Sequence, residues 1–234
     1  MIVRLGPLDP FPPVETARAD YGGLLAVGAD LTPGRLLAAY QHGIFPWGTL
    51  QGQPLWYSPD PRMVLFPAEF RLTRSLAKTL RGKRFDVRFD HDFPAVIAAC
   101  AALPRPGQDG TWIGPEMEHA YIRLHELGWA HSVETWADGE LVGGLYGLAI
   151  GRMFYGESMF ARRRDASKIA FAHLVRYLLA HDFGMIDCQM RTEHLASLGG
   201  REIPRAAFLA RLGELTRPPR SRERWHGENL DRTW

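Results

Sequence analysis

The chain has 234 residues, of which 46% are hydrophobic and 23% are charged, and its formal net charge is +2. This composition is that of a globular protein, and it excludes wholesale disorder, collagen-like repeats and coiled-coil fibres. The net charge does not by itself indicate a nucleic-acid partner, because the distribution of the cations decides that question.

The sequence contains no pattern of a membrane span or a secretory signal. The longest uncharged stretch near the middle, 141–151, is shorter than the ~20 apolar residues that cross a bilayer. Residues 1–15 lack a basic region followed by an apolar one. Cys100 and Cys188 are too few for a disulfide framework and too isolated for a zinc ribbon or a redox pair. We therefore expect a cytoplasmic protein without membrane attachment.

Residues 1–62 are rich in proline, glycine and aromatic residues and predict a small N-terminal domain. One helix is expected there, because Thr32 is a suitable N-cap, Pro33 fits the first helical position and Gly43 can end the helix. The rest of the domain is expected to be loops that pack on aromatic side chains. The proline-rich pattern stops near Pro61, where we place the domain boundary.

Residues 63–217 predict a larger domain of mixed α/β class, followed by an exposed polar tail over 218–234. Helices are expected over 71–81 and 116–127, from about Asp165, near 193–198 and over 204–215. Strands are expected over 132–136, on both sides of the hairpin turn Asp138-Gly139, through MFYGES, and over 185–190. The alternation of strands and helices predicts a mixed sheet covered by helices.

The run MIDCQM, residues 185–190, is the clearest candidate for chemistry. Side chains alternate across a strand, so we expect Asp187 and Gln189 on one face, about 7 Å apart. Such a pair can act as an acid/base carboxylate beside a neutral hydrogen-bond donor. The spacing alone equally allows a structural aspartate that caps a neighbouring loop.

Glu157 is a single charge inside the otherwise apolar or small-residue segment FYGESMF. It can belong to the same site, or it can pair with one of the arginines at 162–164.

A basic stripe follows the predicted helix over 71–81 and extends beyond it. Its members are Arg71, Arg74, Lys78, Arg81, Lys83, Arg84 and Arg88, with the first four inside an arc of about 80°. Such a stripe can track phosphates, although a charged helix face is often only solvated. Trp47, Trp56 and Trp112 lie in predicted loops, where they can stack on bases or fill a small core.

Several motifs are absent from the sequence. It has no glycine-rich phosphate loop, no HExxH, no GxSxG and no CxxC, and its nine histidines are scattered. Chemistry that depends on ATP, NAD or a bound metal therefore lacks its usual signature.

These segments together resemble the leucyl/phenylalanyl-tRNA–protein transferase family. The matching motifs run in order to about residue 215: GLLAVGADLTPGRLLAAYQHGIFPW, WYSPDPR, TWI, ELGWAHSVE, LVGGLYG, GESMF, ASK, IDCQ and HLASLGGREIPR. The resemblance implies a domain like the GCN5-type N-acetyltransferases preceded by a small N-terminal domain. It also implies transfer of Leu or Phe from Leu-tRNA or Phe-tRNA to the α-amine of proteins that begin with Arg or Lys, which marks them for N-end-rule degradation. The implied reaction is direct aminolysis of the ester, without ATP, metal or other cofactor. We expect the enzyme to be a monomer.

The resemblance also assigns roles to individual residues. It implies catalytic roles for Asp187, Gln189 and Glu157 and contact of Trp47 and Trp112 with the 3′-terminal adenosine. The positions that match the apolar pocket for the aminoacyl side chain are Leu145, Met159, Phe171, Leu174 and Leu178. For tRNA binding we expect the basic residues Arg71, Arg74, Lys78, Arg81, Lys83 and Arg84. Our hypothesis is that Asp187 accepts or orients the amine proton, that Gln189 helps to position the reacting groups, and that Glu157 orders this network or contacts the amine.

Three alternatives remain open at this point. An acetyl-CoA-dependent N-acetyltransferase needs a glycine-containing pyrophosphate loop, and the corresponding stretch 162–168 has no glycine. A noncatalytic RNA-binding module accounts for the basic stripe but leaves Asp187 and Gln189 unexplained. Related enzymes transfer leucine to N-terminal Asp or Glu, a preference that the sequence does not reveal.

Overall fold

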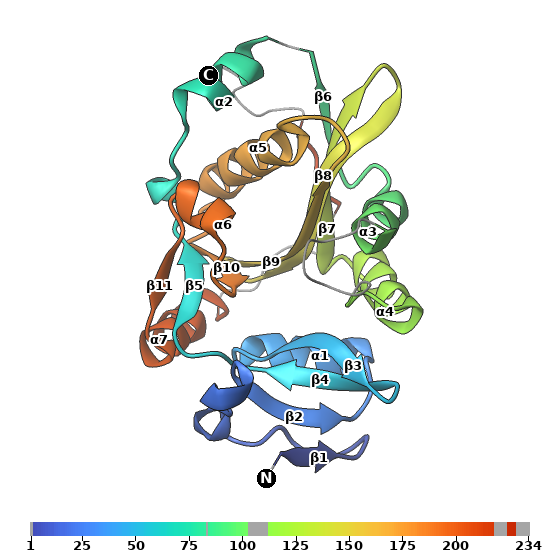
Figure 1. The fold of residues 1–234 in the computed structure, drawn as a ribbon, viewed down its shortest axis with the longest axis vertical. Coiled ribbons are helices and arrows are strands. Elements are labelled where there is room, and N and C mark those ends of the chain that lie inside the picture. The colour runs from blue at the N-terminus through green and yellow to red at the C-terminus, as the bar shows by residue number, and fades with distance from the viewer. Residues whose placement is uncertain (1, 83, 103–111, 218–223, 228–234) are drawn as a thin grey trace.

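The computed structural model describes residues 2–82, 84–102, 112–217 and 224–227, and it contains two sheets (Figure 1). The smaller sheet has the strand order β1-β2-β4-β3 and lies at the N-terminal end of the molecule. Its strands are β1 (Val3–Leu5), β2 (Leu24–Gly28), β3 (Phe45–Leu50) and β4 (Gln53–Tyr57). Short 3-10 helices at Val14–Thr16 and Ala19–Tyr21 lie between β1 and β2.

The expectation of loops in this region is wrong, because prolines that suggested loops are accommodated inside strands. Pro46 lies on β3, at the edge of the sheet, where the register with β4 shifts. Pro54 lies on β4 beyond the residues that pair with β2. Proline is tolerated at edges and bulges because the missing N–H is not needed there. The predicted helix is confirmed as α1 (Pro33–Gln41).

The larger sheet has seven strands in the order β11-β5-β10-β9-β8-β7-β6. Its strands are β5 (Arg62–Leu65), β6 (Asp86–Phe89), β7 (Ala130–Ala137), β8 (Glu140–Ile150), β9 (Met153–Ala161), β10 (Met185–Gln189) and β11 (Arg201–Ile203). All neighbours pair antiparallel except β9 and β10, which are parallel. The mixed α/β class predicted from the sequence is confirmed.

Helices cover both faces of the larger sheet (Figure 1). α5 (Ala166–Ala180) lies on one face, and α3 (Phe93–Ala102) and α4 (Pro115–Glu126) lie on the other. The remaining helices are α2 (Arg74–Arg81), α6 (Glu193–Ser197), α7 (Arg205–Leu215) and the 3-10 helix Pro67–Glu69. Alternating side chains of the central strands divide the interior into two cores. Val133, Leu145, Phe154 and Ile186 face α5, whereas Tyr146, Tyr155 and Met185 face the opposite side.

Two differences from the sequence predictions have clear physical reasons. α3 was not predicted because FPAVIAACAA is apolar on every side and therefore shows no helical period. In the described residues 224–227, Arg224 and His226 are exposed as predicted, but the prediction is wrong for Trp225, which is only 5% exposed and stacks on His131 and Tyr177. Within the described part of the chain, no helix is both long and apolar enough to cross a membrane.

Candidate active site

The site forms where the parallel strands β9 and β10 stop pairing. Their register ends at Tyr155 and Asp187. The pairing of β10 with β5 then shifts between Asp187 and Gln189, and Gln189 has a left-handed φ of 63°. A bulge of this kind re-aims the side chains that follow it. A cavity of about 340 Å³ lies at this point. Its lining includes the residues that follow Tyr155 on β9 and Asp187 on β10.

The cavity has apolar, aromatic and polar parts contributed by several elements. Among the residues that line it, the apolar and aromatic ones include Phe45, Trp47, Trp112, Leu145, Phe154, Met159, Phe171, Leu174, Ile186 and Leu195. Its polar side chains are those of Glu157, Ser158, Cys188, Gln189, Thr192 and His194. Eight of the predicted site residues therefore meet at one cavity, although they are spread over the chain: Trp47, Trp112, Leu145, Glu157, Met159, Phe171, Leu174 and Gln189.

Leu178 and Asp187 do not line this cavity. Leu178 is completely buried in the core between α5 and the sheet, one helical turn beyond Leu174, so the prediction that it contacts a ligand there is wrong. The prediction that Asp187 and Gln189 project from one strand face is also wrong. It assumed regular alternation, which the bulge after Asp187 interrupts.

Asp187 is fully buried and forms a two-pronged ion pair with Arg62 of β5. The Nε and Nη2 of Arg62 donate to the two carboxylate oxygens over 2.8 and 2.6 Å. Oδ1 also accepts from the backbone N–H of Gln189 over 2.9 Å, which holds the residue in its left-handed conformation. Asp187 therefore anchors the turn that carries Gln189, and its side chain does not line the cavity.

Arg62 itself is 1% exposed and joins both sheets. Its guanidinium lies 4.6 Å from the ring centre of Phe45 and 4.7 Å from that of Phe208, and its Nη1 donates to the carbonyl of Gly43. Our sequence predictions missed this residue as a part of the site. The available signal was a single charge at the start of the apolar run RMVLF.

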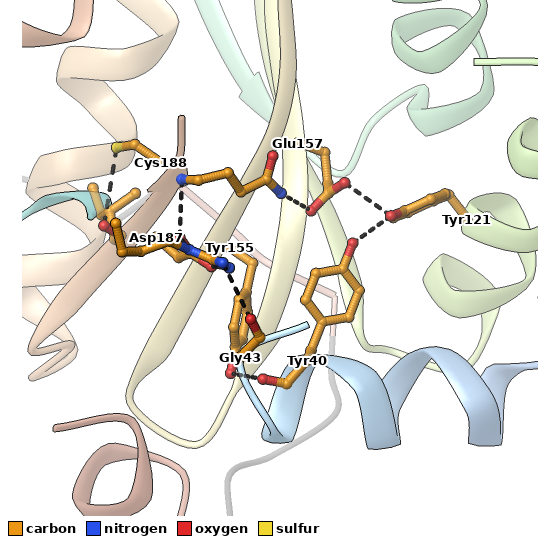
Figure 2. Close-up of polar contacts among 10 residues, drawn as sticks. Tyr40, Gly43, Tyr121, Tyr155, Glu157, Asp187 and Cys188 are labelled. Atoms are coloured by element: carbon orange, nitrogen blue, oxygen red, sulfur yellow. Dashed lines mark hydrogen bonds and ion pairs between the residues drawn. The ribbon is translucent and has the colours of Figure 1, made fainter. Parts of the chain in front are cut away.

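Glu157 lies in a network of neutral hydrogen-bonding groups (Figure 2). Gln189 Nε2 donates to Oε1 over 2.9 Å, and the hydroxyl of Tyr121 donates to Oε2 over 2.8 Å. Since the hydroxyl proton of Tyr121 is used in this way, Tyr40 donates to Tyr121. Burial raises the pKa of Glu157 to about 7, although the hydrogen bonds from Tyr121 and Gln189 oppose the shift.

The alternative that Glu157 pairs with Arg162 or Arg163 is wrong, because both arginines contact other groups. Arg162 donates to the carbonyl of Leu141, and Arg163 pairs with Asp138. Tyr40 and Tyr121 come from α1 and α4, so the N-terminal sheet unit contributes to this network. Burial raises the pKa of both tyrosines well above the ordinary value, which keeps them protonated as donors.

The three tryptophans that the sequence placed in loops have different environments. Trp47 lies on β3 and Trp56 on β4, so the loop prediction is wrong for these two. Trp47 and Trp112 are partly exposed at the cavity, and Trp47 packs edge-on against Tyr57 with ring centres 5.5 Å apart. Trp56 is fully buried, and its Nε1–H donates to the carbonyl of Gly28. Trp56 is therefore a core residue, whereas the other two are available to a ligand.

The predicted basic helix begins three residues later than expected, at Arg74. Thr73 is extended and its Oγ1 accepts the N–H of Leu76, so the helix is capped there and Arg71 precedes it. Exposed side chains of the stripe are those of Arg71, Arg74, Lys78, Arg81 and Arg84, while Lys83 lies outside the described residues. α2 lies at the end of the molecule away from the N-terminal sheet (Figure 1).

His194 of α6 is a titratable cavity residue that our sequence predictions did not include. Burial, together with the charge of Lys168, lowers its pKa, so the ring is neutral at neutral pH. Among the described residues, no group of three or more His, Cys, Asp or Glu side chains is placed to hold a metal ion.

The larger sheet thus opens at one strand pair onto a cavity that is lined by apolar residues and hydrogen-bonding groups. Comparison with family models identifies the family of the chain. Residues 64–213 match the leucyl/phenylalanyl-tRNA protein transferase model, and 29–60 match the model of its N-terminal domain. The chain therefore belongs to the leucyl/phenylalanyl-tRNA–protein transferase family and is an aminoacyltransferase, as the sequence resemblance implied.

Relatives of this family match the chain over nearly its full length. The leucyl/phenylalanyl-tRNA–protein transferase of Dechloromonas aromatica (strain RCB) is 72% identical over 231 residues, which are 99% of each chain. That of Chromobacterium violaceum is 61% identical over 226 residues, 96% of each chain. That of Nitrosomonas eutropha is 57% identical over 234 residues, covering 100% of this chain and 98% of its relative.

Two solved structures match the chain at lower similarity. A GCN5-related N-acetyltransferase from Kribbella flavida has 14% identity and a TM-score of 0.35, with 73% of this chain and 60% of that chain covered. L-PGS from Bacillus licheniformis has 11% identity and a TM-score of 0.41, with 68% and 52% covered. Since both scores are below 0.5, the fold class rests on the sheets described above.

Proposed function

We propose that the protein moves Leu or Phe from aminoacyl-tRNA to the α-amine of proteins that begin with Arg or Lys, which marks them for N-end-rule degradation in the cytoplasm. The observation that carries the proposal is the composition of the cavity, where an apolar part, two half-buried tryptophans and the Glu157–Gln189 pair meet. These are the features that an apolar aminoacyl ester of a terminal nucleoside requires.

The donor fits the cavity in two parts. Leu145, Met159, Phe171 and Leu174 form an apolar wall for the aminoacyl side chain. The half-buried rings of Trp47 and Trp112 are available to stack on the terminal adenine, an interaction that is worth about 1–3 kcal/mol per base. We place the ester carbonyl near Glu157 and Gln189, which line the same cavity.

The reaction needs no separate activation because the aminoacyl ester is already activated. The amine attacks the carbonyl carbon, the bond to the ribose oxygen breaks, and that oxygen leaves with a proton. An N-terminal amine has a pKa of about 8, so little free energy is needed to deprotonate it near neutral pH. Holding ester and amine together can supply up to ~7–11 kcal/mol of the barrier. We therefore propose a reaction without ATP or metal.

The structure changes the roles that we assign to the three polar residues. Gln189 uses its Nε2 to reach Glu157, so its Oε1 is oriented to accept from the attacking amine. Glu157, with a pKa of about 7 raised by burial, is matched to exchange a proton with that amine. Asp187 positions Gln189 through the backbone contact and does not take the proton itself. This replaces the hypothesis that Asp187 acts directly.

We propose that the exposed cations of the basic stripe contact the phosphates of the tRNA. Five of its described members are exposed, and they lie on α2 or just beside it. Each phosphate contact adds to the salt dependence of binding. We also propose that the enzyme acts as a monomer.

The deciding experiment supplies the purified enzyme with Leu-tRNA or Phe-tRNA and peptides that begin with Arg, Lys, Asp or Glu. The expected result is a new amide on the Arg and Lys peptides, with no added nucleotide. Amide formation on the Asp and Glu peptides alone would show the alternative acceptor preference. Failure with all four peptides would overturn the proposal.

Calorimetry with acetyl-CoA tests the acetyltransferase alternative. The turn before α5 contains no glycine, and Asp165 occupies its left-handed position with a φ of 65°. A carboxylate at this helix N-terminus disfavours a pyrophosphate there. We expect no acetyl-CoA binding, and micromolar binding would favour the alternative.

A further inference from the structure

The described C-terminal stretch 224–227 is packed into the larger sheet unit. The indole of Trp225 stacks on the imidazole of His131 at 4.1 Å and on the ring of Tyr177 at 4.3 Å, with interplanar angles of 9° and 23°. Its backbone N–H donates to the buried carboxylate of Asp90 over 2.7 Å. Two ring stacks and a hydrogen bond to a buried charge therefore hold this residue in one position.

Gly227 shows how closely the stretch fits. A Cβ at this position would lie 2.5 Å from the ring of Phe89, which is itself 8% exposed. Any side chain at 227 must therefore displace either the ring or the stretch. His226 between them is exposed and offers a variant that leaves the packing intact.

The indole lies behind the apolar part of the cavity. Phe154 lines the cavity, and its ring centre is 5.7 Å from that of Trp225. Tyr177 follows Leu174 by one turn of α5, and Leu174 also lines the cavity. Trp225 belongs to the same buried core as these side chains. Cavity wall and indole are thus two successive layers of one packed core.

We propose that Trp225 is a specificity-determining residue that limits the depth of the cavity by supporting Phe154 and α5 from behind. The proposal rests on the proposed function, in which the apolar part of the cavity holds the aminoacyl side chain. Packed cores do not refill completely when a large side chain is removed. Loss of the indole leaves space into which Phe154 can move, so the cavity becomes deeper and admits a larger aminoacyl group.

The test measures kcat/KM for Leu-tRNA and Phe-tRNA with one Arg-starting peptide in the same preparation. For Trp225→Ala we expect the Phe/Leu ratio to rise by about threefold or more, since the larger ring uses the released space. The ratio does not depend on the fraction of folded enzyme, because both donors meet the same molecules. Gly227→Ala, which displaces the stretch, should raise the ratio in the same direction, and His226→Ala should leave it unchanged.

The outcomes distinguish failure of the role of Trp225 from failure of the proposed aminoacyl transfer. An unchanged ratio in Trp225→Ala, with both donors still transferred, overturns the role of Trp225. If that variant does not fold, Trp225→Phe and Gly227→Ala replace it, and unchanged ratios in both overturn the role equally. A wild-type enzyme that transfers neither Leu nor Phe shows instead that the proposed function has failed, and the inference fails with it.

Discussion

Arg62→Met removes the cation that neutralises Asp187 and leaves a shorter, apolar side chain in place of the aliphatic part of the arginine. Asp187 is completely buried and accepts from Arg62 through both carboxylate oxygens. In the variant, the carboxylate retains the backbone N–H of Gln189 but loses its counter-charge. The buried carboxylate thus becomes an uncompensated charge inside the fold.

The expected destabilisation is large. Removing one partner of a buried ion pair typically costs about 3–5 kcal/mol, because the other charge remains without solvent or counter-ion. Two further contacts of the guanidinium, over the rings of Phe45 and Phe208, are lost with it. A domain of ordinary stability has about 5–15 kcal/mol in total. The variant should therefore lose a substantial part of its free energy of unfolding.

Urea unfolding measures this loss, and the chain offers a matched control. Arg201 forms the same two-pronged pair with Glu69, with N to O distances of 3.0 Å, but their side chains are 50% and 47% exposed. Arg201→Met should cost only a small fraction of the loss in Arg62→Met, because water solvates the remaining carboxylate. Equal losses in the two variants would refute the assignment of the effect to burial.

A double variant separates charge from packing. Asp187→Asn in the Arg62→Met background removes the uncompensated charge, so it should recover part of the lost stability. The same variants report on activity, since displacement of Gln189 by about 1 Å can reduce turnover about 100-fold. Arg62→Lys should restore part of kcat by restoring a cation. If the double variant is no more stable than Arg62→Met, the buried charge is not the cause.

Three further predictions concern single features of the fold and the site. Burial raises the pKa of Glu157 from 4.5 to about 7, so the folded state binds this proton more tightly than the unfolded state and the free energy of unfolding falls as pH rises through that range. The expected loss is up to about 3 kcal/mol between about pH 5 and about pH 8. Glu157→Gln should abolish the loss in unfolding measured at these two pH values. Arg74→Ala with Lys78→Ala should weaken tRNA binding and lower the slope of log affinity against log salt by about 1–2, measured by filter binding. Thr73→Ala removes the cap on Leu76 and should reduce the free energy of unfolding by about 1 kcal/mol in urea.

Each of these predictions has its own control. For Glu157, an unchanged pH dependence in the variant would show that another group causes it. For tRNA binding, a minimal aminoacyl-adenosine donor should react at the wild-type rate, and neutralising the exposed Arg123 of α4 should leave the salt slope unchanged. An unchanged slope in the double variant would contradict phosphate contact by α2. For the cap, Thr73→Ser keeps the hydroxyl and should retain the stability.

Much of the fold can be predicted from the sequence, because the signals are local. Thr32 and Pro33 mark the start of α1, Asp138-Gly139 marks a hairpin, and the apolar period over 171–178 marks α5. Ordered motifs over the whole chain also identify the family. For the helices and the hairpin, residues close together in the sequence carry the signal, since turns, caps and helix faces depend on short spacings.

The orientation of the polar residues depends on tertiary structure instead. Strict alternation places Asp187 and Gln189 on one face, but a bulge, fixed by Arg62 from a strand 125 positions away, turns them apart. The sequence around Trp225 indicates a polar tail, but in the folded protein its ring stacks on His131 and Tyr177. Local sequence thus indicates which side chains are available for the chemistry. Which of them face the cavity depends on the folded arrangement, because hydrogen-bond partners and strand register are set between segments far apart in the chain.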